Sequence, residues 1–196
     1  MSSLLTMLAG QLDDQAVKQI SSQLGADDRS TQQAISTALP MLMGALGRNA
    51  ESPQGAQALS SALQRDHDGS IFNDVAGALS NPATMQDGQA ILGHVLGGKQ
   101  NNVQMGVAKA SGLDMGSTGQ LLTMLAPLVL GALGQTQQQQ GLDAGALAGL
   151  LQSERQESDS ALSGMAQLLD MDGDGDITDD VINIGSKLLG SFFGSK

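Results

Sequence analysis

The sequence has no Cys, no Trp and no Tyr, and only three Phe among its 196 residues. The absence of Cys excludes disulfide scaffolds, thiolate zinc sites and cysteine nucleophiles, and it leaves the redox compartment open. The scarcity of aromatic rings excludes stacking platforms for nucleic-acid bases or sugars. A hydrophobic core must then come from aliphatic side chains, Ala and ten Met, which favours close helix crossings over thick sheets.

Basic residues are also scarce, with 9 Lys and Arg against 20 Asp and Glu and a formal net charge of −11. Such an acidic chain repels phosphates, so we expect no nucleic-acid partner. No basic start precedes the apolar residues of the N-terminus, so we expect no signal peptide and a cytoplasmic protein. The longest apolar runs, residues 38–47 and 121–134, are shorter than the roughly 20 residues of a membrane-spanning helix, which predicts no transmembrane span.

One part of the sequence occurs twice. The segment PMLMGALG (40–47) returns as PLVLGALG (127–134), and residues 17–47 share 10 identities with residues 104–134. The apolar residues have helical spacing and no segment alternates as a strand does, so we predict an all-α fold. The expected architecture is a compact multi-helix bundle in which two central helices, kinked at their Pro residues, cross on their glycine faces.

An Asp-x-Asp-Gly-x-Ile-x-x-Asp-Val segment follows each copy, starting at Asp66 and at Asp172. The two segments are not equally spaced from their copies, so the second copy contains an insertion, which we predict to be a polar turn followed by an extra helix. The predicted boundaries are 1–196 for a single helical domain, about 17–80 for repeat one, about 104–193 for repeat two and about 153–169 for the inserted helix.

Capping residues predict where several helices begin and end, because short polar side chains favour the first position and Gly the position after the last. The expected starts are Asp13 or Asp14 for a helix that ends at Gly25, and Ser30 or Thr31 for the first central helix. A further helix is expected from about Thr84 to Leu96. It carries His94, which we expect to be a half-buried packing residue rather than a catalytic base.

The stretch DMDGDGDITDDV, residues 170–181, has the pattern of a cation-binding loop and resembles an EF-hand or dockerin-type calcium loop. Calcium takes about six to eight oxygen ligands, and alternate Asp residues on a loop that turns at Gly direct their carboxylates to one centre. Val181 stands where an EF-hand has its bidentate Glu, so either Asp179 or Asp180 closes the site in a shortened loop, or the site is incomplete and weak. If it binds, the expected dissociation constant is on the order of 10⁻⁴ to 10⁻³ M. The candidate metal ligands are Asp170, Asp172, Asp174, Asp176 through its backbone carbonyl, and Asp180.

A structural alternative stays open for both Asp segments. In the later segment, Thr178 or Asp179 would only cap the last helix. The earlier segment, residues 64–75, lacks the leading Asp, so we expect helix capping there, with metal binding as the alternative. Its carboxylates are Asp66, Asp68 and Asp74. His67 lies between two of them and is expected to be a solvated loop residue.

The C-terminal segment, about residues 179–193, repeats large apolar residues at helical spacing. These residues are Val181, Ile184, Leu188 and Phe192, with Leu189 and Phe193 widening the stripe. We expect this face to pack against the core. The alternative is contact with a partner or a membrane surface, and the low number of basic residues argues against the membrane.

Together, the repeated PxxxGALG helix, the two Asp segments and the terminal amphipathic segment resemble a bacterial family known as domain of unknown function 937, related to YidB-like proteins. The resemblance covers about residues 4–193; it implies an all-helical bacterial protein and brings no known activity or catalytic residue. From the residues we expect a non-enzymatic, calcium-binding structural or self-associating module, since no nucleophile–base spacing or cofactor motif occurs. The alternative is a metal-independent homo-oligomeric scaffold or partner-binding protein.

Overall fold

The computed structural model describes the backbone of residues 3–169 and the side chains of residues 4–8 and 10–156. Two compact units make up the chain, Met1–Arg155 and Gln156–Lys196, and most of the described residues belong to the first. Because most of the second unit lies outside the described residues, the predicted single domain and its two repeats stay predictions.

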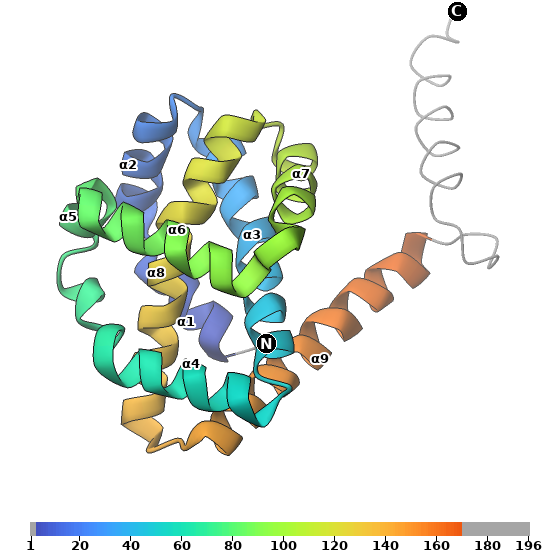
Figure 1. Cartoon of the computed structure of the whole chain (residues 1–196). Coiled ribbons are helices and arrows are strands. Elements are labelled where there is room, and N and C mark those ends of the chain that lie inside the picture. The colour runs from blue at the N-terminus through green and yellow to red at the C-terminus, as the bar shows by residue number, and fades with distance from the viewer. Residues whose placement is uncertain (1–2, 170–196) are drawn as a thin grey trace, which may run out of the picture. The chain divides into compact units, whose positions relative to one another are not determined.

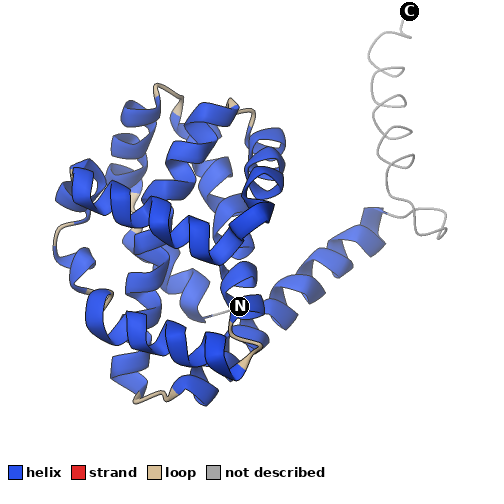
Figure 2. Cartoon of the chain, in the orientation of Figure 1, coloured by secondary structure: helices blue, strands red, loops and turns tan. Residues whose placement is uncertain are grey.

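The described residues are almost entirely helical and contain no strand, which confirms the predicted all-α class (Figure 1, Figure 2). Short connections, many of them carrying a capping side chain, separate the helices. The α-helices are α1 (Ser3–Gln11), α2 (Asp14–Leu24), α3 (Asp28–Asn49), α4 (Pro53–Asp66), α5 (Val75–Ser80), α6 (Pro82–Leu96), α7 (Gln100–Ser111), α8 (Met115–Gln140) and α9 (Ala144–Leu169). Two short 3-10 helices are η1 (Ser70–Asn73) and η2 (Gly97–Lys99).

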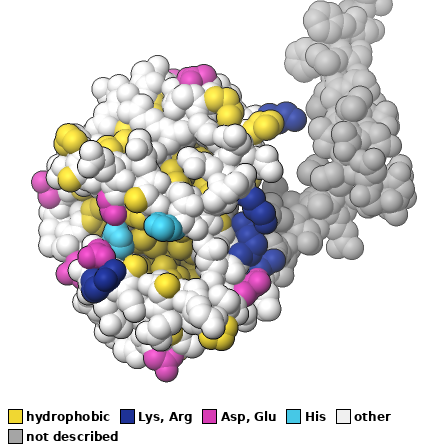
Figure 3. Space-filling view, in the orientation of Figure 1, with side chains coloured by type: hydrophobic (Ala, Val, Ile, Leu, Met, Phe, Trp, Pro, Cys, Tyr) yellow, Lys and Arg dark blue, Asp and Glu magenta, His cyan; other side chains and the backbone are white. Residues whose placement is uncertain are grey.

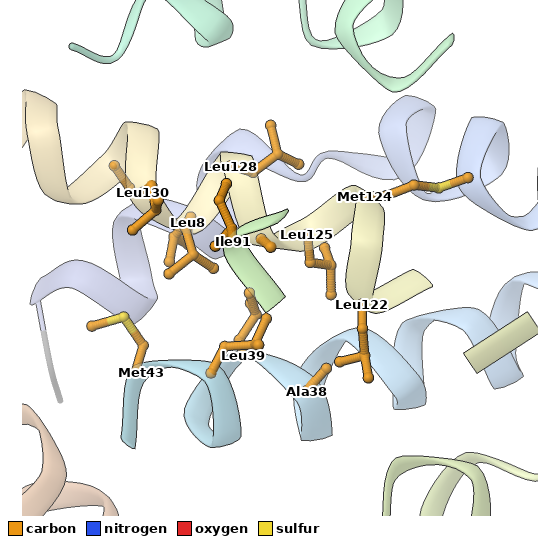
Figure 4. Packing of buried hydrophobic residues seen from close by; sticks show 14 of the residues in the cluster. Leu8, Ala38, Leu39, Met43, Ile91, Leu122, Met124, Leu125, Leu128 and Leu130 are labelled. Carbon is orange, nitrogen blue, oxygen red and sulfur yellow. The ribbon is translucent and has the colours of Figure 1, made fainter. Parts of the chain in front are cut away.

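The central element of the first unit is α8, which contacts α1, α3, α4, α6 and α7. Every residue of α8 from Leu121 to Gly134 is buried. In Figure 4, Leu39 of α3 points toward α8, and Leu122 and Leu125 of α8 point toward α3. The core is therefore built from aliphatic and Met side chains, as the shortage of aromatic residues predicts.

By length and composition alone, α8 would pass as a membrane-spanning helix, with a mean hydropathy of 1.3 over its most apolar window. Within the fold, however, 78% of that window is buried among the surrounding helices. A helix that is apolar on all sides and enclosed by other helices has the character of a core helix. The position of α8 thus accounts for its apolar sequence.

Both helices that carry the PxxxGALG segment begin after an Asp. The Asp27 carboxylate accepts a hydrogen bond from the Ser30 backbone N–H at 2.9 Å, and Asp114 accepts one from Ser117 at 3.0 Å. The predicted cap of α3 at Ser30 or Thr31 is therefore wrong by about one helical turn. The carboxylate of Asp27 is the stronger cap because its negative charge also interacts favourably with the helix dipole.

Other helix ends agree with the sequence. The Asp13 side chain accepts a hydrogen bond from Ala16 N–H at 2.8 Å, and Gly25 ends α2 with a φ of 64°, so both predicted caps are confirmed. Pro40 and Pro127 lie inside α3 and α8, as expected from the sequence. The kinks at these residues and the internal duplication stay predictions.

The glycine face of α8 does not meet that of α3, so the predicted crossing of two glycine faces is wrong. A Cβ atom added to Gly134 would overlap the backbone carbonyl of His67, in the loop that follows α4. In α3, a Cβ on Gly47 would lie 3.5 Å from the carbonyl oxygen of Leu151 in α9. The two central helices meet through aliphatic side chains, while Gly134 faces the loop after α4 and Gly47 faces α9.

The helix α9 is continuous from Ala144 to Leu169, so the polar turn predicted at the start of the insertion is absent there. The residues concerned include Glu, Arg and Gln but no Gly or Pro, and polar residues of this kind favour a helix as well as a loop. Within the first unit, Leu147 and Leu151 are buried, and Arg155 Nη1 lies 2.7 Å from Glu51 Oε1. The first part of α9 is therefore held against the end of α3.

Candidate functional site

A groove with a volume of about 660 Å³ lies between α4 and α6. In Figure 3 it forms a hollow with hydrophobic side chains on its floor and histidines at its edge. Leu46 of α3 and Leu130 of α8 contribute to the floor. The walls comprise Gly55, Ala58, Leu59 and Ala62 on α4 and Asp87, Ala90, Ile91, His94 and Val95 on α6. Most of the lining is therefore small or aliphatic, and polar groups flank it.

The helix α4 uses two of its faces. On one face, Ser60 and Leu63 are buried, and Ser60 Oγ lies 2.7 Å from Gln137 Nε2, which donates a hydrogen bond to it from α8. On another face, Ala58 and Ala62 line the groove with side chains that stop at Cβ. The helix is thus fixed on α8 while its small residues leave space beside α6.

Asn49, the last residue of α3, links α3 to the end of α6 by hydrogen bonds at one end of the groove. Its Nδ2 donates hydrogen bonds to the backbone oxygens of Val95 at 3.1 Å and His94 at 3.4 Å. These carbonyls belong to the last turn of α6, where no intrahelical donor is available. The His94 side chain itself is exposed, so the predicted half-buried position is wrong. It projects from the solvent side of this last turn, beside the groove.

His67 lies at the other end of the groove, directly after α4. Its side chain is only 10% exposed, and its Nδ1 lies 3.8 Å from Asp87 Oδ2 of α6. The prediction of a solvated loop residue is therefore wrong. The physical reason is the close approach of the loop to α8: the His67 carbonyl occupies the space that a side chain at residue 134 would need. This close approach places the His67 imidazole next to Asp87 of α6.

The earlier Asp segment surrounds a second, smaller hollow of about 390 Å³. Asp68 Oδ1 accepts a hydrogen bond from Ser70 N–H at 2.9 Å, and Asp74 Oδ1 accepts one from Gly77 N–H at 2.8 Å. The hydroxyl of Ser70, followed by its backbone N–H, lowers the pKa of the Asp68 carboxyl. The predicted capping role is thus confirmed for Asp74, which caps α5, whereas Asp68 holds the turn before η1.

Asp66 also lines this smaller hollow and lies 3.4 Å from the guanidinium of Arg65. Over the described part of the chain, no three His, Asp or Glu side chains are grouped so that they would hold a metal ion. The predicted calcium ligands Asp170, Asp172, Asp174, Asp176 and Asp180 lie outside the described residues, as do Asp179 and the C-terminal stripe.

The groove itself is absent from the sequence predictions. Its signal is the spacing of small residues, with Gly55, Ala58 and Ala62 along one face of α4 and Ala90 on α6. In a helix, positions separated by three or four residues share a face, so this spacing indicates a smooth strip along α4. The spacing on α4 does not predict which helix forms the opposite wall of the groove, because that helix, α6, begins 16 residues after α4 ends.

The family comparison covers nearly the whole chain. The family model for bacterial proteins of unknown function, DUF937, matches residues 6–136 and again residues 135–196. Comparison with curated proteins and with solved structures finds no match. The family match confirms the resemblance to this family seen in the sequence and adds no activity to it, and the relation to YidB-like proteins stays a prediction. The chain therefore belongs to the DUF937 family of bacterial proteins.

Proposed function

We propose that this protein is a non-enzymatic binding module whose α4/α6 groove receives an amphipathic helix of a protein partner. The observation that carries the proposal is the matched pair of walls. Ala58 and Ala62 on α4 stand opposite Ala90 and Ile91 on α6, above an aliphatic floor. Grooves of this kind bind helices that present large apolar residues at positions i, i+3, i+4 and i+7.

The dimensions of the groove support a helical ligand. Its walls are helices of 14 and 15 residues, which at ~1.5 Å per residue are roughly 20 Å long. A bound helix of about four turns would therefore lie along both walls. The volume of the groove, about 660 Å³, falls within the range of roughly 300–1,000 Å³ found for ligand sites.

The polar groups at the groove support binding rather than catalysis. His67 is placed beside Asp87, and the Ser52 hydroxyl accepts a hydrogen bond from Gly55 N–H at 3.0 Å, which caps α4. Charged and polar groups that flank an apolar strip fix the direction and register of a bound helix. We assign these groups the same role here.

A labelled peptide tests the proposal directly. The probe is a designed amphipathic 15-residue peptide with Leu at i, i+3, i+4 and i+7, a length chosen to match α6. Fluorescence anisotropy measures its binding to the full chain and to the variant Ala62→Arg, in which a long charged side chain projects into the groove. Gln57→Arg is the matched control, because Gln57 is exposed on the same helix and does not line the groove.

We expect the wild type and the control variant to bind the peptide with the same affinity, and Ala62→Arg to bind it roughly tenfold or more weakly. Circular-dichroism melting checks that both variants fold. Measurable and equal binding of the peptide by Ala62→Arg and the wild type, with both folded, would show that the groove is not the site.

Calcium binding at residues 170–181 is a second proposal, supported by the sequence pattern of alternating Asp residues. Calcium should raise the melting temperature of the wild-type chain relative to chelator, because ligands that bind only the folded state stabilise it. The double variant Asp172→Asn, Asp174→Asn should lose this response. A melting temperature that calcium leaves unchanged in the wild type would remove calcium from the proposal and leave the groove unaffected.

A further inference from the structure

We infer that the occupant of the α4/α6 groove is the C-terminal segment, residues 179–193, of a second copy of this chain. Two copies then exchange these segments, each filling the groove of the other. The inference rests on the proposed function of the groove and deepens it by naming the helix that binds.

The segment carries large apolar residues, and the groove walls leave space for them beside Gly and Ala. Its stripe contains Leu188, Leu189 and two of the three Phe of the chain, Phe192 and Phe193. The groove walls combine small residues, among them Gly55, Ala58 and Ala62, with the aliphatic Leu59 and Ile91, and their lining residues include no Phe, Tyr or Trp. Large side chains that enter spaces between small ones give the close packing that helix association requires.

The polar residues of the segment fit the same arrangement. At about 3.6 residues per turn, Asp179 falls on the side of the predicted helix opposite to Leu188, and Asp180 and Lys187 fall at the edge of the stripe. A helix bound by its apolar stripe would therefore keep these charges in water. The segment has 15 residues, as many as α6, so its length matches that of the groove wall.

The area of a reciprocal exchange is sufficient for a stable dimer. A buried Phe side chain removes roughly 150–250 Å² from water, so the two Phe of each segment together contribute roughly 600–1,000 Å² to a pair of contacts. The Val, Ile and Leu residues of the stripe add to this area. The total reaches the roughly 1,200–2,000 Å² of a stable interface, and the twofold arrangement closes, which limits the assembly to two copies.

The first test is the mass of the full chain in solution, measured by size-exclusion chromatography with light scattering over a range of concentrations. We expect a wild-type dimer that dissociates in Leu188→Asp and in Ala62→Arg, each with a dissociation constant raised roughly thirtyfold or more. Asn183→Asp is the matched control for the segment, because residue 183 lies away from the stripe, and Gln57→Arg is the control for the groove. Both controls should remain dimeric.

Mixing the two monomeric variants separates exchange from other modes of association. The Ala62→Arg chain retains an intact segment, and the Leu188→Asp chain retains an intact groove. A mixture should therefore form a heterodimer held by one segment–groove contact, although neither variant dimerises alone. A wild-type chain that is monomeric at every concentration, or a dimer that both variants leave intact, would overturn the inference.

Peptide binding distinguishes failure of this inference from failure of the proposed function. A labelled peptide of residues 179–193 should bind the Leu188→Asp chain, whose groove is free, and should not bind Ala62→Arg. If the designed amphipathic peptide binds the Leu188→Asp chain while the 179–193 peptide does not, the groove keeps its function and its occupant is a different partner. If neither peptide binds, both proposals fail.

Discussion

The helices α3 and α8 carry the same PxxxGALG segment but place its glycines in different surroundings. In α8, Gly134 lies against the backbone of the loop after α4, and a Cβ on Gly131 would lie 2.6 Å from Ile71 Cγ2. In α3, a Cβ on Gly44 would lie 3.7 Å from the Arg48 side chain and would meet no other helix among the described residues. The same residues are thus required by close backbone packing in one helix and tolerated in the other.

The apolar residues of the shared segment also differ in burial between the two helices. Leu128 of α8 is 1% exposed, whereas Met41, at the matching position of α3, is 36% exposed and packs near Gly106 of α7. A helix enclosed on all sides needs complementary shapes on all sides, while a helix with an open side does not. Shared sequence therefore predicts a shared element, and the environment decides what each residue contributes.

The largest predicted effect separates the last glycines of the two segments. Gly134→Ala should destabilise the protein by about 3 kcal/mol or more, because its Cβ would overlap a backbone carbonyl that cannot rotate away. Gly47→Ala should gain up to about 1 kcal/mol from its higher helix propensity, since its Cβ would have ordinary contacts. Urea unfolding of both variants measures the difference, and equal stabilities would contradict the distinction drawn between the helices.

A second pair of glycines extends the comparison to α6. A Cβ on Gly88 would overlap the carbonyl oxygen of Thr123 in α8, whereas a Cβ on Gly93 would meet no other segment of the described chain within 4 Å. We expect Gly88→Ala to cost about 2 to 3 kcal/mol and Gly93→Ala to gain up to about 1 kcal/mol. Thermal melting followed by circular dichroism would reveal both changes, and a stable Gly88→Ala protein would show that α6 can move away from α8.

A smaller effect concerns the end of α8, which extends beyond the segment it shares with α3. Ser60→Ala removes the acceptor of the hydrogen bond from Gln137 Nε2, which keeps its bond to the Leu142 carbonyl at 3.1 Å. We expect a loss of about 1 kcal/mol. Ser61→Ala, at the neighbouring and less buried position, should change stability by less than about 0.5 kcal/mol. Equal losses of stability in the two variants would mean that the change comes from replacing Ser within α4 and not from the hydrogen bond to Gln137.

The smallest effect should be the response of the two Asp caps to acid. Hydrogen bonds from Ser30, first from its backbone and then from its side chain, lower the pKa of Asp27 below the ordinary value of 3.8. For Asp114 the Ser117 hydroxyl is the larger cause, followed by its backbone N–H. Because both carboxylates bind protons less readily in the folded state, their stabilising effect is present above pH 3.8 and lost as the pH falls through their lowered pKa values.

Asn at residues 27 and 114 should keep the caps but remove this titration. Below an ordinary Asp pKa of about 4, the double variant Asp27→Asn, Asp114→Asn should therefore lose less stability on acidification than the wild type. Melting temperatures between about pH 5 and pH 2 measure the two slopes. Parallel slopes would mean that these caps do not contribute to acid sensitivity.

Local features of the fold were predictable from the sequence, and long-range features were not. The ends of α2 and the apolar core helix α8 follow from neighbouring residues and their spacing. The cap at Asp27 was missed because several polar residues in a row compete for that role, and the carboxylate prevails through its charge.

The groove and the position of His67 depend on where distant segments meet. Nothing near His67 in the sequence indicates that its carbonyl will lie against Gly134, 67 residues later. Likewise, the small residues of α4 define a groove only because α6 returns beside them over α8. Pairings of this kind are properties of the folded chain rather than of any local pattern.

The late position of α8 in the chain has a consequence for how the protein folds. During synthesis, α1 to α7 leave the ribosome before residues 115–140, although α1, α3, α4, α6 and α7 all contact that helix. Until α8 arrives, the apolar faces of these helices have no common surface to cover them, and such faces are prone to aggregation in nascent chains. Completion of the core therefore waits for contacts that are distant in sequence, which slows folding relative to a bundle of sequential neighbours.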